Sequence, residues 1–178
     1  MDDTPQTPEP AASGPLAWLG PRLFRMGLGI ALAVLALDQF SKWAIWHNLV
    51  PAHRAIALFP GFNLTHVCNY GVSFGGLHWL GPWALSLLAA AISVGLVFWL
   101  RKAETRLLAV AIGMVIGGAI GNVIDRLSMG CVADFLDFYI PGTDWPHWPA
   151  FNVADSAIVV GVGLIVLDGV FAERGKKA

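Results

Sequence analysis

Three aspartates of this 178-residue chain stand in or beside long apolar stretches, where ionisable side chains are rare. Asp125 follows one apolar run, Asp134 lies between apolar neighbours in a connecting segment, and Asp155 opens the last apolar run. A charge at membrane depth costs at least about 2.5–3.5 kcal/mol, so each acid is a candidate functional residue. Two neighbouring carboxyl groups can share one proton, because like charges raise one pKa while the other group stays ionised. Such a pair supplies the base and the acid that activate water against a peptide carbonyl.

Side chains that donate hydrogen bonds accompany these acids at helical spacing. Asn122, Asp125 and Arg126 stand at i, i+3 and i+4, which predicts one polar helix face with Asp125 paired to Arg126. Asn152 and Asp155 repeat the spacing of three. Amide and guanidinium groups donate to carbonyl oxygens and can stabilise an oxyanion. The spacing does not decide which two of the three acids work together.

Asp38 and Lys42 end the first apolar run at a spacing of four, which places both on one helix face and lets their charges neutralise each other. A structural role and a functional role are both open for this pair. Asp168 lies near the opposite end of the last run, close to Arg174, and is interpreted as a helix-end residue without chemistry.

The sequence contains four apolar runs that are long enough to form membrane-spanning helices. The chain is 56% hydrophobic and only 13% charged, which excludes an ordinary soluble domain. A spanning helix needs about 20 apolar residues to cross a hydrocarbon core of about 30 Å. Three glycines of the third run, Gly117, Gly118 and Gly121, permit close approach of a neighbouring helix. The predicted spans are Leu23–Trp46, Trp79–Leu100, Leu107–Ile124 and Val153–Ala172.

The Lys and Arg residues predict the orientation of these spans. With four spans, the segment before the first span, the connection between the second and third, and the segment after the fourth lie on one side of the membrane. Eight of the eleven basic residues fall in these three places: Arg22, Arg25, Arg101, Lys102, Arg106, Arg174, Lys176 and Lys177. Short connections rich in Lys and Arg stay cytoplasmic, so a multi-pass protein of the cytoplasmic (inner) membrane with both termini in the cytoplasm is expected. Segments 47–78 and 127–151 then face outward, and the acids meet near the outer face.

The first 20 residues differ from the rest in composition. They are rich in Pro, Thr, Asp and Ala, which predicts a disordered cytoplasmic tail at 1–20 before a membrane domain at 21–178. The first span is too long for the apolar region of a typical signal peptide, and no A-x-A-like site follows it, so cleavage is not expected.

The outward segments predict a small sheet and an anchor at the membrane surface. Residues 54–59 and 62–67 flank Pro60-Gly61, a turn signal, and the second run alternates apolar with polar residues. Segment 138–151 mixes Trp and Tyr with Pro, which is typical of anchoring at the headgroup level.

Two cysteines, Cys68 and Cys131, fall on the outward side, where a disulfide could persist. Two residues do not establish a disulfide framework, and the favoured interpretation is two small, partly buried residues without a role. No Cys or His pair has the spacing of zinc ligands, and the five histidines are interpreted as solvated or interfacial.

Five short motifs resemble, in order, those of the bacterial lipoprotein signal peptidases, the signal peptidase II family. They are Asp38-Gln-x-Ser-Lys42, Asn69-x-Gly71-x-Ser73-Phe74, Gly121-Asn122-x-x-Asp125-Arg126, Val132-x-Asp134-Phe135 and Phe151-Asn152-x-Ala154-Asp155. Each motif alone is weak, but five in order on four predicted spans are specific. Ser73 departs from the Ala that the family often has, and both residues are small.

The resemblance implies an all-α membrane protein with four transmembrane helices and a small extracytoplasmic β-sheet. It implies an aspartic endopeptidase whose catalytic residues are Asp134 and Asp155, without a metal or another cofactor. The implied substrate is a lipid-modified prolipoprotein in the membrane lipid, cut just before its diacylglyceryl-modified cysteine, and a monomer is expected. The expected substrate-binding or supporting residues are Asn69, Asn122, Arg126, Asn152, Asp125, Asp38, Lys42, Gly71 and Gly118.

Two other classes of protein fit the sequence less well. A small ion- or proton-coupled membrane transporter also needs intramembrane charges, but here the polar groups gather at one surface and form no chain across the bilayer. A noncatalytic membrane subunit would not need paired carboxylates. Nucleic acid is not an expected partner, because no basic stripe is present to neutralise phosphates.

Overall fold

The computed structural model describes residues 22–51, 54–71, 81–143 and 147–177. Four long apolar helices and one small sheet confirm the predicted fold class. The predicted N-terminal tail and the motif residues Ser73 and Phe74 lie outside the described residues. Along the chain the elements are α1 (Arg22–Ala44), a π-helical segment (Ile45–Leu49), β1 (Ala55–Phe59), β2 (Phe62–Asn69), α2 (Pro82–Leu100), α3 (Arg106–Met129), β3 (Val132–Phe138) and α4 (Val153–Lys177).

Local signals set both ends of α3. The helix begins after Thr105, whose hydroxyl accepts a hydrogen bond from the Leu108 N–H at 3.0 Å, as an N-cap residue does. It ends at Gly130, whose φ of +78° suits glycine and whose N–H donates to the Arg126 carbonyl. The helix therefore continues past the predicted end at Ile124 and includes the polar residues that follow.

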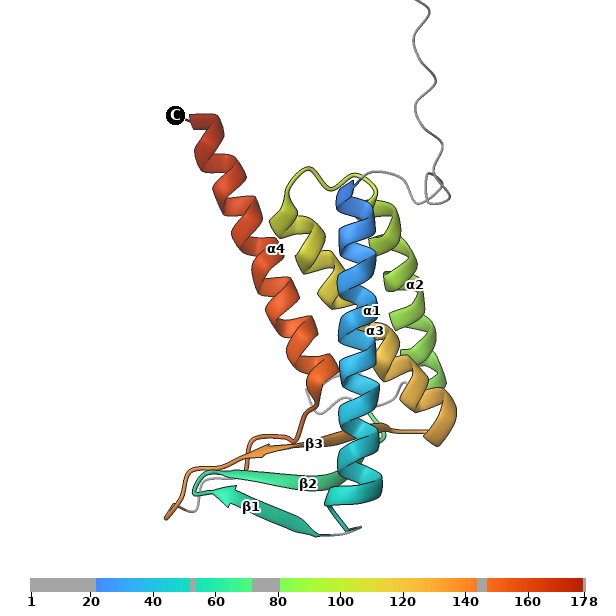
Figure 1. The fold of residues 1–178 in the computed structure, drawn as a ribbon, viewed down its shortest axis with the longest axis vertical. Helices are drawn as coiled ribbons and strands as arrows, with labels where there is room; N and C mark the ends of the chain where they lie inside the picture. Colours follow the sequence, from blue (N-terminus) through green and yellow to red (C-terminus); the bar gives the residue numbers. More distant parts are fainter. Residues whose placement is uncertain (1–21, 52–53, 72–80, 144–146, 178) are drawn as a thin grey trace, which may run out of the picture.

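Helix α3 lies at the centre of the bundle and contacts each of the other three helices (Figure 1). A Cβ at Gly117 would collide with the Ala31 carbonyl oxygen in α1, and one at Gly118 with the Ala154 carbonyl oxygen in α4. Lipid gives no hydrophobic driving force between helices, so close backbone packing through small residues helps to hold the bundle together. The predicted close approach at the α3 glycines is confirmed.

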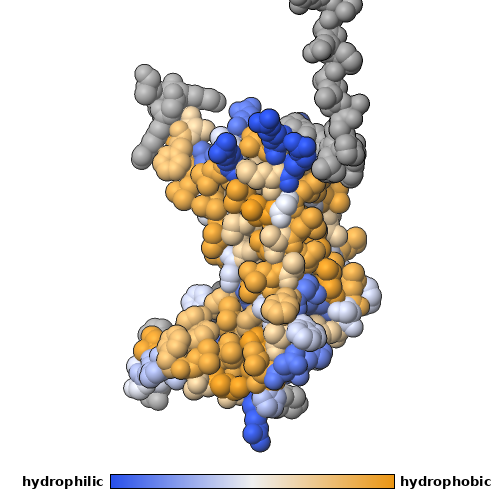
Figure 2. Space-filling view, viewed as in Figure 1, coloured by the Kyte–Doolittle hydropathy of each residue, from blue (hydrophilic) through white to orange (hydrophobic). Residues whose placement is uncertain are grey.

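The outer surfaces of the helices are apolar, as a lipid environment requires. Figure 2 shows this hydrophobic surface over the bundle, with hydrophilic residues at the end that carries the turn between α2 and α3 and others at the end that carries the sheet. Arg101 and Lys102 are exposed in that turn. Exposed apolar side chains on the helices include Leu32, Leu37, Leu87, Val94, Val159, Val166 and Phe171.

A three-stranded antiparallel sheet in the order β1-β2-β3 lies across the end of the bundle where α1 and α3 end and α4 begins (Figure 1). The predicted hairpin of β1 and β2 is confirmed, with Gly61 in its turn at a φ of +95°. The sequence predicts no strand at β3. Five of the seven residues of β3 are buried, so no alternation of apolar and polar residues marks it.

Cys68 and Cys131 form a disulfide that joins the end of β2 to the segment between α3 and β3. Their Cα atoms lie 5.6 Å apart. The interpretation of two separate cysteines is therefore corrected, because the antiparallel pairing of β2 with β3 brings together two residues that are 63 positions apart in the sequence.

Gly118→Ala should destabilise the protein, because its new methyl group would collide with the Ala154 carbonyl, and overpacking costs about 1–3 kcal/mol. Gly163→Ala in α4 is the matched control: nothing lies within 4 Å of the added Cβ, and alanine favours a helix by about 1 kcal/mol over glycine. Thermal melts in detergent should show a lower Tm for Gly118→Ala and an unchanged or higher Tm for Gly163→Ala. Equal Tm values would contradict the close packing of α3 on α4.

Candidate active site

A reciprocal pair of hydrogen bonds fixes the start of α4. Asn152 precedes the helix, and its Oδ1 accepts a hydrogen bond from the Asp155 N–H at 2.9 Å. In return, Asp155 Oδ2 accepts one from the Asn152 N–H at 3.3 Å. This is a capping box, in which the N-cap residue and the third helical residue satisfy each other's free N–H groups. Helix initiation therefore fixes the position of the Asp155 carboxylate.

The Asn152 side chain also holds a second acid. Its Nδ2 donates to Asp134 Oδ1 at 2.8 Å, with longer contacts to Asn122 Oδ1 at 3.2 Å and the Ala133 carbonyl at 3.4 Å. Asn152 is fully buried, with 0% of its surface exposed. One amide thus bonds to Asp134 through nitrogen and to the Asp155 backbone through oxygen, and this brings the two acids into one site.

The segment before α4 is attached to β3 by its backbone. The Phe151 N–H donates to the Leu136 carbonyl at 3.1 Å, and the Leu136 N–H donates to the Phe151 carbonyl at 2.8 Å. This antiparallel bridge carries the next residue, Asn152, to the side of Asp134 in β3.

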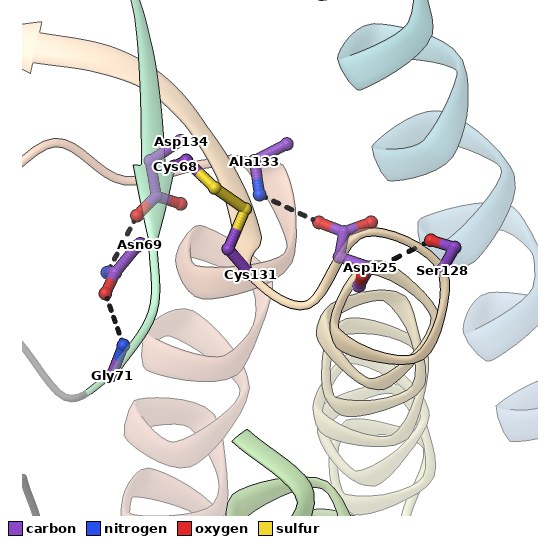
Figure 3. The surroundings of a disulfide bond; sticks show 8 residues. All are labelled: Cys68, Asn69, Gly71, Asp125, Ser128, Cys131, Ala133 and Asp134. Carbon is purple, nitrogen blue, oxygen red and sulfur yellow. Dashed lines mark hydrogen bonds between the residues drawn. A yellow bond between two sulfur atoms is a disulfide. The ribbon is translucent and has the colours of Figure 1, made fainter. Parts of the chain in front are cut away.

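Asp134 is almost completely buried, with 1% exposed. Its Oδ2 accepts a hydrogen bond from Asn69 Nδ2 at 2.9 Å, while the Gly71 N–H donates to the Asn69 oxygen at 3.2 Å (Figure 3). Burial raises the pKa of Asp134 from 3.8 to about 7; the Asp155 charge adds to this rise, and hydrogen bonds from Asn69 and Asn152 oppose it. At neutral pH this carboxyl group can therefore lose and regain a proton.

Two residues of α3 complete the site. Asn122 Nδ2 donates to Asp155 Oδ1 at 2.7 Å. One turn later, Arg126 donates through Nη1 to the Asn122 carbonyl at 3.3 Å, and its buried Nε has no hydrogen-bond partner among the described residues. Both oxygens of Asp155 are thus held, and Arg126 lines the cavity beside them.

A cavity of about 590 Å³ opens beside Asp155. Asp134 lies behind Asn69, which contacts both the cavity and this acid. The volume falls within the range of about 300–1,000 Å³ that is usual for ligand pockets. The lining combines Asn69, Gly71, Arg126, Asp155 and Ser156 with the mainly apolar residues Trp148, Pro149, Ala150, Phe151, Ile158, Val159 and Val160.

A second polar cluster lies behind the acids, at the ends of α1 and α3. Lys42 Nζ lies 2.7 Å from Asp38 Oδ2 and 2.7 Å from Asp125 Oδ2, and Lys42 is only 4% exposed. The predicted neutralisation of Asp38 by Lys42 is confirmed. The predicted partner of Asp125 is corrected from Arg126 to Lys42, because Asp125 lies against α1 whereas Arg126 lines the cavity.

The carboxylates of this Lys42 cluster reach the backbone beside each candidate acid. Asp38 Oδ1 accepts a hydrogen bond from the Ala154 N–H at 2.9 Å. Asp125 Oδ2 accepts one from the Ala133 N–H at 3.1 Å (Figure 3). Ala154 and Ala133 immediately precede the two acids in the sequence. One buried ion cluster therefore anchors both acids through their backbones.

The contacts of Gln39 and Gly121 with the Lys42 cluster were not predicted from the sequence, although both residues stand in the family motifs. Gln39 Nε2 donates to Asp125 Oδ1 at 3.1 Å and to Asp38 Oδ2 at 3.2 Å, and its polarity inside an apolar run was a usable signal. Gly121 leaves room for the Asp38 carboxylate, which a Cβ there would meet.

Asp168, interpreted as a helix-end residue, accepts a hydrogen bond from the Thr105 hydroxyl at 2.6 Å, outside both clusters. The predicted supporting residues separate into Asn69, Gly71, Asn122, Arg126 and Asn152 around the two acids, Asp38, Lys42 and Asp125 in the Lys42 cluster, and Gly118 against α4.

A buried carboxyl group and a partly buried one, both held by amides at one end of four membrane-spanning helices, form the kind of site that an aspartic hydrolase of the membrane requires. A family model described as Signal peptidase (SPase) II matches residues 30–171. The chain belongs to the signal peptidase II family.

Individual relatives agree with this assignment. The lipoprotein signal peptidase of Aeromonas hydrophila is 44% identical over 156 residues, covering 84% of this chain and 90% of that protein. That of Pseudoalteromonas atlantica is 49% identical over 146 residues, covering 79% and 87%. A bacterial membrane enzyme solved by the in meso method at 2.3 Å resolution has a TM-score of 0.71 at 30% identity, covering 86% of this chain and 92% of that chain.

The raised pKa of Asp134 predicts that stability depends on pH. Between pH 3.8 and about 7 the folded protein keeps a proton that the unfolded chain has lost, so the free energy of unfolding falls as pH rises. Thermal melts in detergent should give a lower Tm at about pH 8 than at about pH 5. The difference should shrink in Asp134→Asn, whose side chain does not ionise. An equal difference in both proteins would contradict the buried, protonated state of Asp134.

Proposed function

We propose that Asp134 and Asp155 are the catalytic pair with which this signal peptidase II removes the signal peptide from prolipoproteins. The enzyme is an aspartic endopeptidase that cuts before a diacylglyceryl-modified cysteine. The observation that carries the proposal is the buried amide of Asn152, which bonds to Asp134 and to the backbone of Asp155. Asp125 pairs with Lys42 in the ion cluster behind the acids, which supports its exclusion from the catalytic pair.

The two acids work as one unit that carries a single proton. The ionised acid takes a proton from water as the water oxygen bonds to the carbonyl carbon, and the other acid protonates the carbonyl oxygen. The resulting diol collapses when the peptide nitrogen takes a proton from the first acid and leaves as an amine. One hydroxyl of the diol returns its proton to the second acid, so both acids regain their starting states.

Donors around the cavity hold the substrate during these steps. The Arg126 guanidinium group lines the cavity and can donate to a substrate carbonyl oxygen, and Asn69 and Asn152 keep the Asp134 carboxyl group in place. In proteases the loss of one donor to the developing oxyanion costs about a hundredfold or more in rate.

The cavity wall supports a substrate that is itself anchored in the membrane. Ile158, Val159 and Val160 of α4 line the cavity, and Val159 and Val160 are also exposed on the outer surface of the bundle. An acyl chain or an apolar signal-peptide segment can lie against this wall without leaving lipid. Lipid-modified prolipoprotein and membrane lipid are therefore the proposed binding partners.

The site belongs to the outer face of the inner membrane, with both termini in the cytoplasm. Two features support this orientation. Exposed Arg101 and Lys102 lie at the end of the bundle opposite the sheet, as expected for the cytoplasmic side. The Cys68–Cys131 disulfide lies beside the site, and disulfides persist in oxidising compartments.

Both acids and their donors come from one chain, which supports a monomeric enzyme.

A transporter remains without support. The relatives are lipoprotein signal peptidases, and the described ionisable residues that are buried between the helices gather at the end of the bundle that carries the sheet. An ion path would need such residues across the whole bilayer.

Asp134→Asn and Asp155→Asn should each abolish cleavage, because each amide keeps the side-chain shape but can neither take nor supply the shared proton. The double variant should be scarcely worse than either single one, since residues that act as one unit are not additive. The measurement is cleavage of a lipid-modified prolipoprotein by purified variants whose folding has been matched by thermal melt.

Asp125→Asn is the comparison variant in this experiment. It removes one of the two carboxylates that neutralise Lys42, so it should lower the Tm and the yield while activity per folded molecule remains measurable. A fully active Asp134→Asn beside an inactive, well-folded Asp125→Asn would move the catalytic pair to Asp125 and Asp155.

A further inference from the structure

The Cys68–Cys131 disulfide lies at the active-site end of the sheet, although no step of the proposed reaction uses it. Cys68 precedes Asn69, the last residue of β2, whose amide donates to Asp134. Cys131 stands between α3 and β3, three residues before Asp134, and is 1% exposed. Figure 3 shows the disulfide beside the hydrogen bond from Asn69 to Asp134.

The pairing of β2 with β3 does not by itself fix Asn69. The ladder is regular as far as the Leu64–Leu136 pair and then shifts register before Val67 pairs with Asp134. At this shift two residues of β2 lie opposite one residue of β3, as in a β-bulge, which bends the strand and interrupts the ladder. The regular pairing before the bulge therefore does not fix the position of Asn69, which lies after the bulge.

Asn69 also stands at a strand end, where the ladder stops at its partner Val132. Strand ends open more readily than strand interiors, because fewer hydrogen bonds hold them. The Asn69 amide must nevertheless stay 2.9 Å from Asp134 Oδ2 to make its hydrogen bond. The disulfide at the preceding residue, Cys68, restricts the opening of this strand end.

We propose that the Cys68–Cys131 disulfide is a positioning element of the active site, which holds the Asn69 amide against Asp134. The inference rests on the proposed catalytic function of Asp134. The hydrogen bond from Asn69 lowers the pKa of Asp134, so loss of the disulfide should raise it. The disulfide therefore affects the proton chemistry of the site as well as the stability of the sheet.

The experiment uses full-length variants in detergent with a lipid-modified prolipoprotein as substrate. Cys68→Ala with Cys131→Ala removes the link, and Asn69→Ala removes the donor that the link is proposed to hold. Asn63→Ala is the matched control, because Asn63 Nδ2 donates to Asp137 Oδ2 at 2.8 Å and so joins the same two strands on the other side of the bulge.

The cysteine double variant should show kcat reduced by about tenfold or more with a smaller change in KM, because small displacements of a catalytic group are costly. Its pH–rate profile should move to higher pH, as that of Asn69→Ala should. Adding Asn69→Ala to the double variant should cause little further loss, since both changes act through one hydrogen bond. Asn63→Ala should lower the Tm but leave kcat per folded molecule within about twofold.

A second measurement covers the case in which the cysteine variant does not fold. Wild-type enzyme is reduced with a phosphine until a maleimide reagent labels the released thiols, and kcat should fall in proportion to the labelled fraction. An unchanged kcat and pH profile after loss of the disulfide would overturn the inference, as would two labelled thiols in unreduced native membranes. A fully active Asp134→Asn would instead overturn the proposed function, so the two failures are distinguishable.

Discussion

The buried Lys42 cation is the constraint on which the rest of the site depends. Its ammonium group lies in the interior of the bundle and has to be paired, because removing one partner of a buried ion pair costs about 3–5 kcal/mol. Asp38 and Asp125 neutralise it from α1 and α3. These carboxylates also accept hydrogen bonds from the Ala154 and Ala133 N–H groups. The carboxylates that neutralise this one cation therefore also hold the first residues of α4 and β3, next to the two proposed catalytic acids.

Each amide near the acids makes hydrogen bonds to more than one group. An unsatisfied polar group inside an apolar bundle costs several kcal/mol, roughly 2–7, and these shared hydrogen bonds avoid that cost. Asn152 caps α4 with its oxygen and holds Asp134 with its nitrogen. Asn122 accepts a hydrogen bond from Lys42 and donates one to Asp155, so it connects the ion cluster to the acid. Shared donors and acceptors of this kind make a network cooperative. A substitution at either amide is therefore expected to disturb both acids together, and its effect should not add to that of its neighbours.

The spans and the hairpin could be predicted from the sequence, because long apolar runs and a Pro-Gly turn are local signals. The spacing of four likewise predicted the pair of Asp38 and Lys42. Strand β3 could not be predicted, because burial of five of its seven residues removes the alternation that marks a strand. The prediction that Asp125 pairs with Arg126 was wrong. Arg126 is the next residue in the sequence, so it lies about 100° further around the helix and faces the cavity. The choice of Asp134 over Asp125 came from the family motifs, since spacing gives no distance between separate elements.

The position of the cavity along α4 favours a substrate that reaches the acids from within the membrane. Helix α4 packs on α3 and contacts α1, whereas its outer face carries Val159 and Val160, which are 71% and 50% exposed. The same two residues line the cavity together with Asp155. A soluble peptide would have to leave water to pass this surface, but a chain already anchored in lipid would not. The apolar surroundings that favour such access also bury Asp134, which raises its pKa to about 7 and strengthens its hydrogen bonds. The proposed access from lipid and the proposed proton sharing between the acids therefore share one physical cause, the low dielectric constant of the site.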